Sequence, residues 1–139
     1  MLTNRRTIRI EWGDCDPAGI VYFPRYIEYL DACTVHLFEA AGLPKQAMLK
    51  QFEMAGFPMV DLKARFLIPS RFTDDVVVES TVSEWKRSSF VVHHRLLRGE
   101  DLAVEAFETR VWSVYDAASP GGLKSCPVPD EVKARFNQA

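Results

Sequence analysis

Two carboxylates stand close together in a turn-rich stretch near the start of the chain. Asp14 and Asp16 flank Cys15, and Pro17 and Gly19 follow directly. Carboxylates at this spacing could bind a metal ion, act as an acid and a base, or accept hydrogen bonds from backbone amides in a tight turn. An Asx-turn is the ordinary role of either aspartate alone, so the neighbouring residues must indicate whether this stretch does chemistry.

A predicted helix start follows about eight residues after Asp16, at Pro24, because proline is favoured at the first position of a helix. Free amides at a helix start carry the positive end of the helix dipole and can stabilise a developing oxyanion. An acyl group whose carbonyl oxygen lies at those amides would present its carbon to Asp16. The carboxylate could attack it directly, forming a mixed anhydride, or deprotonate a water molecule, which requires a raised pKa. The residues leave both routes open.

The helix that would carry these amides is predicted over residues 24–41, and Gly42 and Pro44 end it. Its side chains facing the core recur at every third or fourth position. They are Ile27, Leu30, Thr34, Leu37, Phe38 and Ala41.

Alternation of apolar and polar residues predicts the strands. These strands are expected at 8–12, 60–68, 76–85, 90–97 and 102–115, with a shorter helix or lid at 45–55 and one or two helical turns at 131–136. Short turns at 86–89 and 98–101 join the last three strands as hairpins, so the sheet is antiparallel with helices on one side. The sequence therefore predicts an α+β fold whose second sheet face needs either solvent or another subunit.

The composition is that of an ordinary globular protein. Its 139 residues contain 17 Lys and Arg against 19 Asp and Glu, a net charge of −2, so no basic field favours nucleic acid. This length predicts a single domain over residues 1–139. The sequence shows neither a signal peptide nor a membrane-spanning apolar run, and its three widely spaced cysteines do not suggest a disulfide framework. We expect a cytoplasmic protein with no nucleic-acid and no membrane partner.

Other nucleophiles and ligands fit the pattern less well. The acidic neighbours of Cys15 would raise the pKa of its thiol, so we interpret Cys15 as a small packing residue. His93 and His94 are adjacent on a predicted strand and must point to opposite faces, which prevents them from binding one metal ion together. No Gly-x-Ser-x-Gly sequence marks a serine nucleophile.

The stretch GDCDPAGIVYFPRY at 13–26 resembles the signature of the 4-hydroxybenzoyl-CoA thioesterases and their acyl-CoA thioesterase relatives. Further stretches are similar to the same family: LDA at 30–32, GLP at 42–44, DDV at 74–76 and EWKRSSFV at 84–91. The resemblance covers roughly residues 8–115. It implies a hotdog fold, in which an antiparallel sheet wraps one long helix, assembled as a homodimer or homotetramer.

The resemblance also implies roles for individual residues. The catalytic carboxylate of the family falls on Asp16, and the backbone amide that polarises the thioester carbonyl falls on Phe23. Aromatic and other side chains near this amide shape the acyl pocket, which in this sequence implies Tyr22 and Pro24. Phe23 lacks the aromatic hydroxyl that the 4-hydroxybenzoyl enzyme has at this place, so the identity of the acyl group stays open.

Three residues of the hairpin at 86–89 complete the expected substrate site. Basic residues corresponding to Lys86 and Arg87 contact the phosphates of coenzyme A in the family, and Ser88 could add a hydroxyl donor. A few local cations suffice to capture phosphates in an acidic protein. Coenzyme A enters as part of the substrate, and neither a metal nor a redox cofactor is implied.

The expected function is hydrolysis of an aryl-, short- or medium-chain acyl-CoA to a carboxylic acid and free coenzyme A. One alternative is a module of the same fold that binds or senses acyl-CoA without catalysis, because fold does not determine function. Another is a hydratase acting on an enoyl thioester, which would need an aspartate and a histidine working together; the sequence places no such pair.

Overall fold

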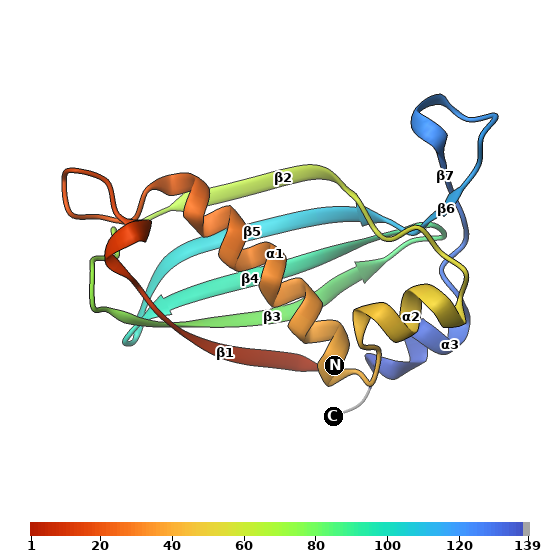
Figure 1. The fold of residues 1–139 in the computed structure, drawn as a ribbon. Coiled ribbons are helices and arrows are strands. Elements are labelled where there is room, and N and C mark those ends of the chain that lie inside the picture. The colour runs from red at the N-terminus through yellow and green to blue at the C-terminus, as the bar shows by residue number, and fades with distance from the viewer. Residues whose placement is uncertain (138–139) are drawn as a thin grey trace.

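The computed structural model of the protein describes residues 1–137, and its centre is one long helix lying across an antiparallel sheet (Figure 1). The sheet has five strands in the order β1-β3-β4-β5-β2. Its strands are β1 (Thr3–Arg9), β2 (Met59–Phe66), β3 (Asp75–Trp85), β4 (Ser89–Arg98) and β5 (Asp101–Val111). The helix is α1 (Phe23–Ala40). This arrangement confirms the predicted antiparallel α+β architecture.

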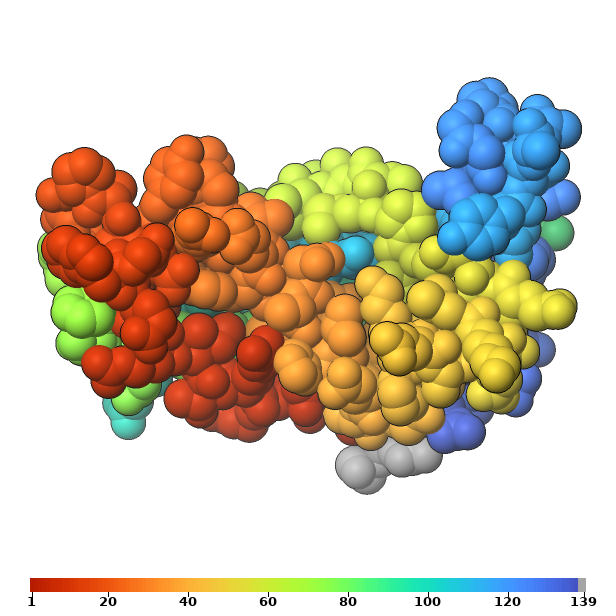
Figure 2. All heavy atoms as spheres, viewed as in Figure 1, coloured from red at the N-terminus to blue at the C-terminus, as the bar shows by residue number. Residues whose placement is uncertain are grey.

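The remaining elements gather at the two ends of the sheet. At one end the 3-10 helix η1 (Trp12–Asp14) leads into the loop before α1. At the other end lie the elements α2 (Lys45–Gln51), β6 (Ser113–Tyr115), η2 (Pro120–Gly122), β7 (Leu123–Ser125) and α3 (Asp130–Arg135). In the space-filling view of Figure 2, the loop before α1 and the β6–β7 pair stand out at opposite ends of the molecule. Within residues 1–137, every helix is too short or too polar to cross a membrane.

The face that α1 buries differs slightly from the predicted one. Tyr26 and Cys33 are buried, whereas Ile27 is only partly buried. Tyr26 faces inward because its hydroxyl has a polar partner there, the backbone N–H of Ser70 at 3.2 Å. Gly42 ends the helix with a positive φ of 81°, as its position predicts.

Several predicted strand boundaries were wrong; the first strand begins at Thr3 rather than residue 8, and the second ends at Phe66 rather than residue 68. The first strand was expected at 8–12, but β1 ends at Arg9, because its ladder with β3 ends at the pair Arg9 and Asp75. Beyond that pair the chain turns, and Trp12 is 68% exposed. The last strand was expected to run unbroken over 102–115; it stops at Val111 and resumes as β6.

The strand β2 forms one edge of the sheet and pairs only with β5 within residues 1–137. Large apolar side chains are exposed along and just beyond it, with Val60 61%, Phe66 48% and Leu67 47% accessible. An open edge carrying apolar side chains is a surface on which another chain can pair.

Candidate active site

The loop before α1, residues 13–22, is a small hairpin with Asp16 near its tip; we call it the site loop. Two backbone hydrogen bonds hold its two arms together. Tyr22 N–H donates to the Asp14 carbonyl at 2.8 Å, and Asp16 N–H donates to the Ile20 carbonyl at 2.9 Å. Between these bonds Cys15 and Val21 form a β-bridge. The site loop therefore holds Asp16 in a defined position relative to the start of α1.

The Asp16 carboxylate has one oxygen engaged and one available. Its Oδ1 accepts the Ala18 N–H at 2.8 Å, which is the Asx-turn expected of an aspartate in such a stretch. Its Oδ2 has no hydrogen-bond or ion-pair partner within residues 1–137, and the side chain is only partly buried. The turn therefore orients the carboxylate and leaves one oxygen able to attack a carbon or take a proton.

The first turn of α1 presents one unused amide. Tyr22 precedes the helix in an extended conformation, with φ −67° and ψ 120°. Arg25 N–H donates to the Tyr22 carbonyl at 2.8 Å, and Pro24 has no N–H. Phe23 N–H has no acceptor within residues 1–137. The helix start therefore directs the unpaired Phe23 N–H, at the positive end of the helix dipole, toward any carbonyl placed before it.

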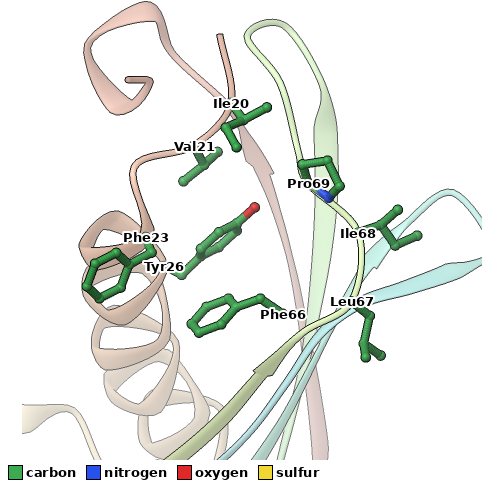
Figure 3. A pocket seen from close by; sticks show the side chains of 8 residues that line it. All are labelled: Ile20, Val21, Phe23, Tyr26, Phe66, Leu67, Ile68 and Pro69. Atoms are coloured by element: carbon green, nitrogen blue, oxygen red, sulfur yellow. The ribbon is translucent and has the colours of Figure 1, made fainter. Parts of the chain in front are cut away.

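An apolar cavity of about 310 Å³ lies beside this amide. Figure 3 shows its lining side chains: Ile20 and Val21 from the site loop, Phe23 and Tyr26 from α1, and the segment 66–69 opposite. The cavity walls are almost entirely carbon, which suits the apolar part of an acyl thioester. Of the predicted site residues in and beside the helix start, only Phe23 lines the cavity, whereas Asp16, Tyr22 and Pro24 are not among its lining residues.

The side chains of Asp14 and Cys15 make structural contacts in and around the site loop. The Asp14 carboxylate accepts the Glu11 N–H at 3.3 Å and faces Arg25 Nε at 3.8 Å. Cys15 Sγ donates to the Glu11 carbonyl at 3.6 Å, which agrees with its interpretation as a packing residue. No group of three or more His, Cys, Asp and Glu side chains within residues 1–137 could hold a metal ion.

The predicted phosphate-binding hairpin does not lie near the site loop of the same chain (Figure 1). The site loop adjoins the start of β3, because Val21 N–H donates to the Ser70 carbonyl and Ile20 bridges Arg71. Lys86 and Arg87 follow the other end of β3 and are exposed. That strand spans 11 residues, which corresponds to roughly 33 Å at the usual rise per residue. One chain therefore keeps the two predicted parts of the site apart.

The adjacent histidines point to opposite faces of β4, as predicted. His93 lies on the outer face, where it stacks on Phe107 at 4.4 Å between ring centroids. His94 is fully buried beneath α1, with Nδ1 2.7 Å from Ser80 Oγ and Nε2 3.2 Å from Glu108 Oε1. A serine, a histidine and a carboxylate so arranged resemble a nucleophilic triad, but all three side chains are sealed in the core. They cannot reach a substrate.

Sequence reasoning missed this buried group of polar side chains. The signal available was Glu108 and Arg110, two charges separated by one residue within the apolar alternation of a strand, which places both on the same face. Burial alone would raise the pKa of Glu108, but hydrogen bonds and charge attraction from His94 and Arg110 outweigh burial and hold that pKa below its ordinary value of 4.5.

This lowered pKa predicts an acid-dependent loss of stability. A carboxylate whose folded pKa is depressed stabilises the fold fully above its unfolded pKa and loses that contribution as the pH falls through the folded value. We expect the melting temperature of the wild type to fall more steeply below pH 4.5 than that of Glu108→Gln, which has no proton to gain. Thermal unfolding followed by circular dichroism across pH 3 to 7 measures this, and parallel curves for the two proteins would contradict it.

Comparison with known proteins agrees with this geometry. The family model described as the thioesterase-like superfamily matches residues 10–136. The chain belongs to this superfamily. It is 40% identical over 128 residues to the 4-hydroxybenzoyl-CoA thioesterase of Pseudomonas sp. (strain CBS-3), with 87% of this chain and 88% of that protein covered.

Two solved structures extend the comparison to three dimensions. The structure of the Pseudomonas enzyme has a TM-score of 0.87 and 32% identity, covering 96% of this chain and 98% of the other. An aspartate-to-asparagine mutant of 4-hydroxybenzoyl-CoA thioesterase complexed with 4-hydroxybenzoyl-CoA gives a TM-score of 0.90 at 31% identity, covering 97% and 99%. The fold is therefore the hotdog fold that the signature at 13–26 implied.

Proposed function

We propose that the protein is an acyl-CoA thioesterase that hydrolyses a thioester to a carboxylic acid and free coenzyme A. The observation that carries this proposal is the unpaired Phe23 amide at the start of α1, directly after the hairpin that presents the available oxygen of Asp16. The similarity to a 4-hydroxybenzoyl-CoA thioesterase supports the same conclusion.

The proposed chemistry uses both groups at one carbonyl. Phe23 N–H donates to the thioester oxygen and stabilises the negative charge that develops on it. The Oδ2 oxygen of Asp16 either attacks the carbonyl carbon or takes a proton from the water that attacks. The C–S bond then breaks, and the sulfur leaves as a thiolate that takes up a proton. On the direct route, water cleaves the resulting mixed anhydride and restores the Asp16 carboxylate.

We propose an aryl-, short- or medium-chain acyl group as the substrate class. A 310 Å³ cavity lined by aromatic and aliphatic side chains accepts a ring or a modest alkyl chain. The relative that is 40% identical is named for an aryl substrate, 4-hydroxybenzoyl-CoA. Phe23 has no hydroxyl to offer a polar ring substituent, so the acyl specificity of this protein can differ from that of its relative.

We also propose that the working form is a homodimer or homotetramer. The open edge of β2 and the exposed side chains of Phe23 and Phe66, 61% and 48% accessible, give a second copy an apolar surface to cover. A second copy could also bring the two predicted parts of the substrate site together, because its hairpin at 86–89 can approach the site loop of the first copy. Lys86, Arg87 and Ser88 of one copy would then bind coenzyme A held at the Asp16 of another.

Removing the hairpin cations is expected to weaken binding and leave the chemical step intact. We expect Lys86→Ala and Arg87→Ala each to raise KM about fivefold, the size of an exposed charge contact, with kcat little changed. Steady-state kinetics at two salt concentrations check this, because the effect should shrink as salt screens the phosphates. Lys124→Ala, an exposed lysine on β7, is the matched control. A KM for both hairpin variants equal to that of the control would contradict the proposed phosphate contact.

A cytoplasmic protein that needs no metal or redox cofactor remains our expectation. The three cysteines are unpaired, and burial raises the pKa of the Cys33 thiol to about 11. Unpaired thiols are typical of a reducing compartment. The high pKa of Cys33 also keeps this residue from reacting in assays that use a thiol reagent.

A thiol-release screen tests the proposed function. The wild-type protein is mixed with short, medium, long and aryl acyl-CoA thioesters, and free coenzyme A is measured with a thiol reagent. The proposal expects turnover with at least one aryl, short or medium thioester. Thermal stabilisation by acyl-CoA without thiol release would indicate a binding module instead. Loss of the absorbance of a conjugated enoyl thioester without thiol release would indicate a hydratase. The His94–Glu108 pair beneath α1 is buried away from any substrate, and His93 pairs with Glu105 on the outer face of the sheet.

A further inference from the structure

A polar network crosses the apolar interface between α1 and the sheet. Thr34 of α1 donates its hydroxyl proton to Glu108 Oε1 at 2.6 Å, and His94 Nε2 lies 3.1 Å from the Thr34 oxygen. Arg110 donates its Nε–H to the same carboxylate oxygen at 3.1 Å. These four residues are at most 5% exposed. One carboxylate oxygen therefore collects contacts from the helix and from two strands.

The proton positions in this network follow from the donors available. Thr34 gives its only proton to Glu108, and an ionised carboxylate can only accept. The Nε2 of His94 must therefore carry a proton directed at these two oxygens. The other ring nitrogen, Nδ1, then accepts the Ser80 hydroxyl at 2.7 Å when the ring is neutral. These bonds are satisfied together only in one relative placement of α1 and the sheet.

The network lies between two halves of the apolar core. One half contains Leu37 and Phe38 of α1, and the other contains Leu30 and Cys33; Thr34 separates them along the helix. Apolar contacts have no preferred direction and tolerate small sliding or rotation of a helix. A buried hydrogen bond does not, because it weakens steeply away from its ideal distance and angle. The network therefore specifies the register of α1 more sharply than the surrounding apolar side chains can.

Arg110 adds a second contact to α1 and extends the same restraint to one further segment. Its NH2 group donates to Asp31 Oδ1 on α1 at 2.7 Å, and its NH1 group donates to the Phe57 carbonyl at 3.3 Å. Phe57 lies in the connection between α2 and β2. One guanidinium thus joins the helix, strand β5 and the segment that leads into the edge strand, with a different nitrogen used for each.

We infer that Thr34, Glu108 and Arg110 are positioning residues, which hold α1 in the register that brings the Phe23 amide to the acyl carbonyl facing Asp16. This inference rests on the proposed thioesterase function. Phe23 precedes Thr34 by three helical turns, about 16 Å along a rigid helix. A displacement at Thr34 therefore moves the Phe23 amide by a similar amount relative to the opposite wall of the cavity at 66–69, which continues strand β2. Misplacement by about 1 Å can cost a hundredfold in rate.

A pair of substitutions at Thr34 separates positioning from stability. Thr34→Val keeps the shape and removes the donor to Glu108, whereas Thr34→Ser keeps the hydroxyl and removes a methyl group. We expect Thr34→Val to lower kcat roughly tenfold, a partial misplacement, with little change in KM. We expect Thr34→Ser to retain most of the wild-type kcat. Each rate is measured on protein shown to be folded by circular dichroism at the assay temperature.

A second readout does not depend on activity. In protein labelled with ¹⁵N-phenylalanine, the Phe23 amide resonance, identified by its loss in Phe23→Leu, should shift in Thr34→Val. It should keep its position in Val78→Ala, a change to a buried apolar side chain of β3 that is not part of the network. If Thr34→Val does not fold, Glu108→Gln takes its place. A wild-type kcat and an unmoved Phe23 resonance, with only a lower melting temperature, would overturn the inference. Absence of thiol release by the wild type would instead refute the proposed function, and the resonance would still decide the positioning role.

Discussion

Replacing Asp16 with asparagine should reduce kcat by about 10²- to 10⁴-fold, the range expected when a positioned proton acceptor is lost. Asparagine cannot take the proton of a water molecule, and its amide is a poor nucleophile. Its side-chain oxygen can still accept the Ala18 N–H, so the turn that orients residue 16 is retained. We therefore expect the melting temperature and KM to stay close to those of the wild type. The measurement is steady-state thiol release with the best thioester from the screen.

The chain contains a matched control for this substitution. Asp116 accepts the Ala118 N–H at 3.2 Å in the same kind of Asx-turn, but it lies in the β6–β7 connection, far from the site loop. Asp116→Asn should hydrolyse the thioester at the wild-type rate. Near-normal hydrolysis by Asp16→Asn would remove Asp16 from the mechanism. A single turnover in ¹⁸O-water detects the direct route with hydrolysis at the Asp16 carboxyl carbon, because an unlabelled oxygen of Asp16 then leaves with the first molecule of product.

Removing the Phe23 amide should have the second-largest effect. Phe23→Pro deletes this N–H, and loss of one donor to a developing oxyanion costs about 10²- to 10³-fold in kcat. The fold accepts proline here for two reasons. Residue 23 is the first of α1, where proline is favoured, and its N–H has no acceptor to lose. Tyr22 already has the extended conformation that a residue before proline must adopt, with ψ at 120°.

The control for this variant is Phe23→Ala, which removes the ring but keeps the amide. The alanine variant should lose much less kcat than Phe23→Pro, and its KM can rise because the ring lines the cavity. Both variants should unfold near the wild-type temperature. Equal loss of kcat in the two variants would show that the ring matters and that the backbone donor does not.

The local structure around Asp16 could be predicted from the sequence because it is encoded in neighbouring residues. Turn-forming residues around Asp16 and the proline at 24 mark a loop followed by a helix start, and both are present. The hairpin turns at 86–89 and 98–101 likewise predicted the antiparallel order of β3, β4 and β5. In each case the signal and the structure that it predicts lie within a few residues of one another.

What the sequence did not reveal depends on contacts between distant segments. The end of β1 at Arg9 follows from where β3 begins, some 65 residues later. The burial of Tyr26 depends on a backbone partner at Ser70. The convergence of Thr34 and Glu108 requires the helix to lie over the centre of the sheet. The separation of Lys86 from Asp16 likewise becomes visible only when β3 is laid out at full length.

The most direct measurement is the carbonyl stretching frequency of a bound thioester. An acyl-CoA labelled with ¹³C at the thioester carbonyl is bound to Asp16→Asn, which should hold it without turnover, and isotope-edited infrared difference spectra are recorded. If the Phe23 amide donates a hydrogen bond to the carbonyl, the stretching frequency should lie below that of the same thioester in water. In the double variant Asp16→Asn/Phe23→Pro, which lacks this amide, the frequency should return toward the solution value. The same frequency in the single and the double variant would contradict the claim that this amide polarises the carbonyl.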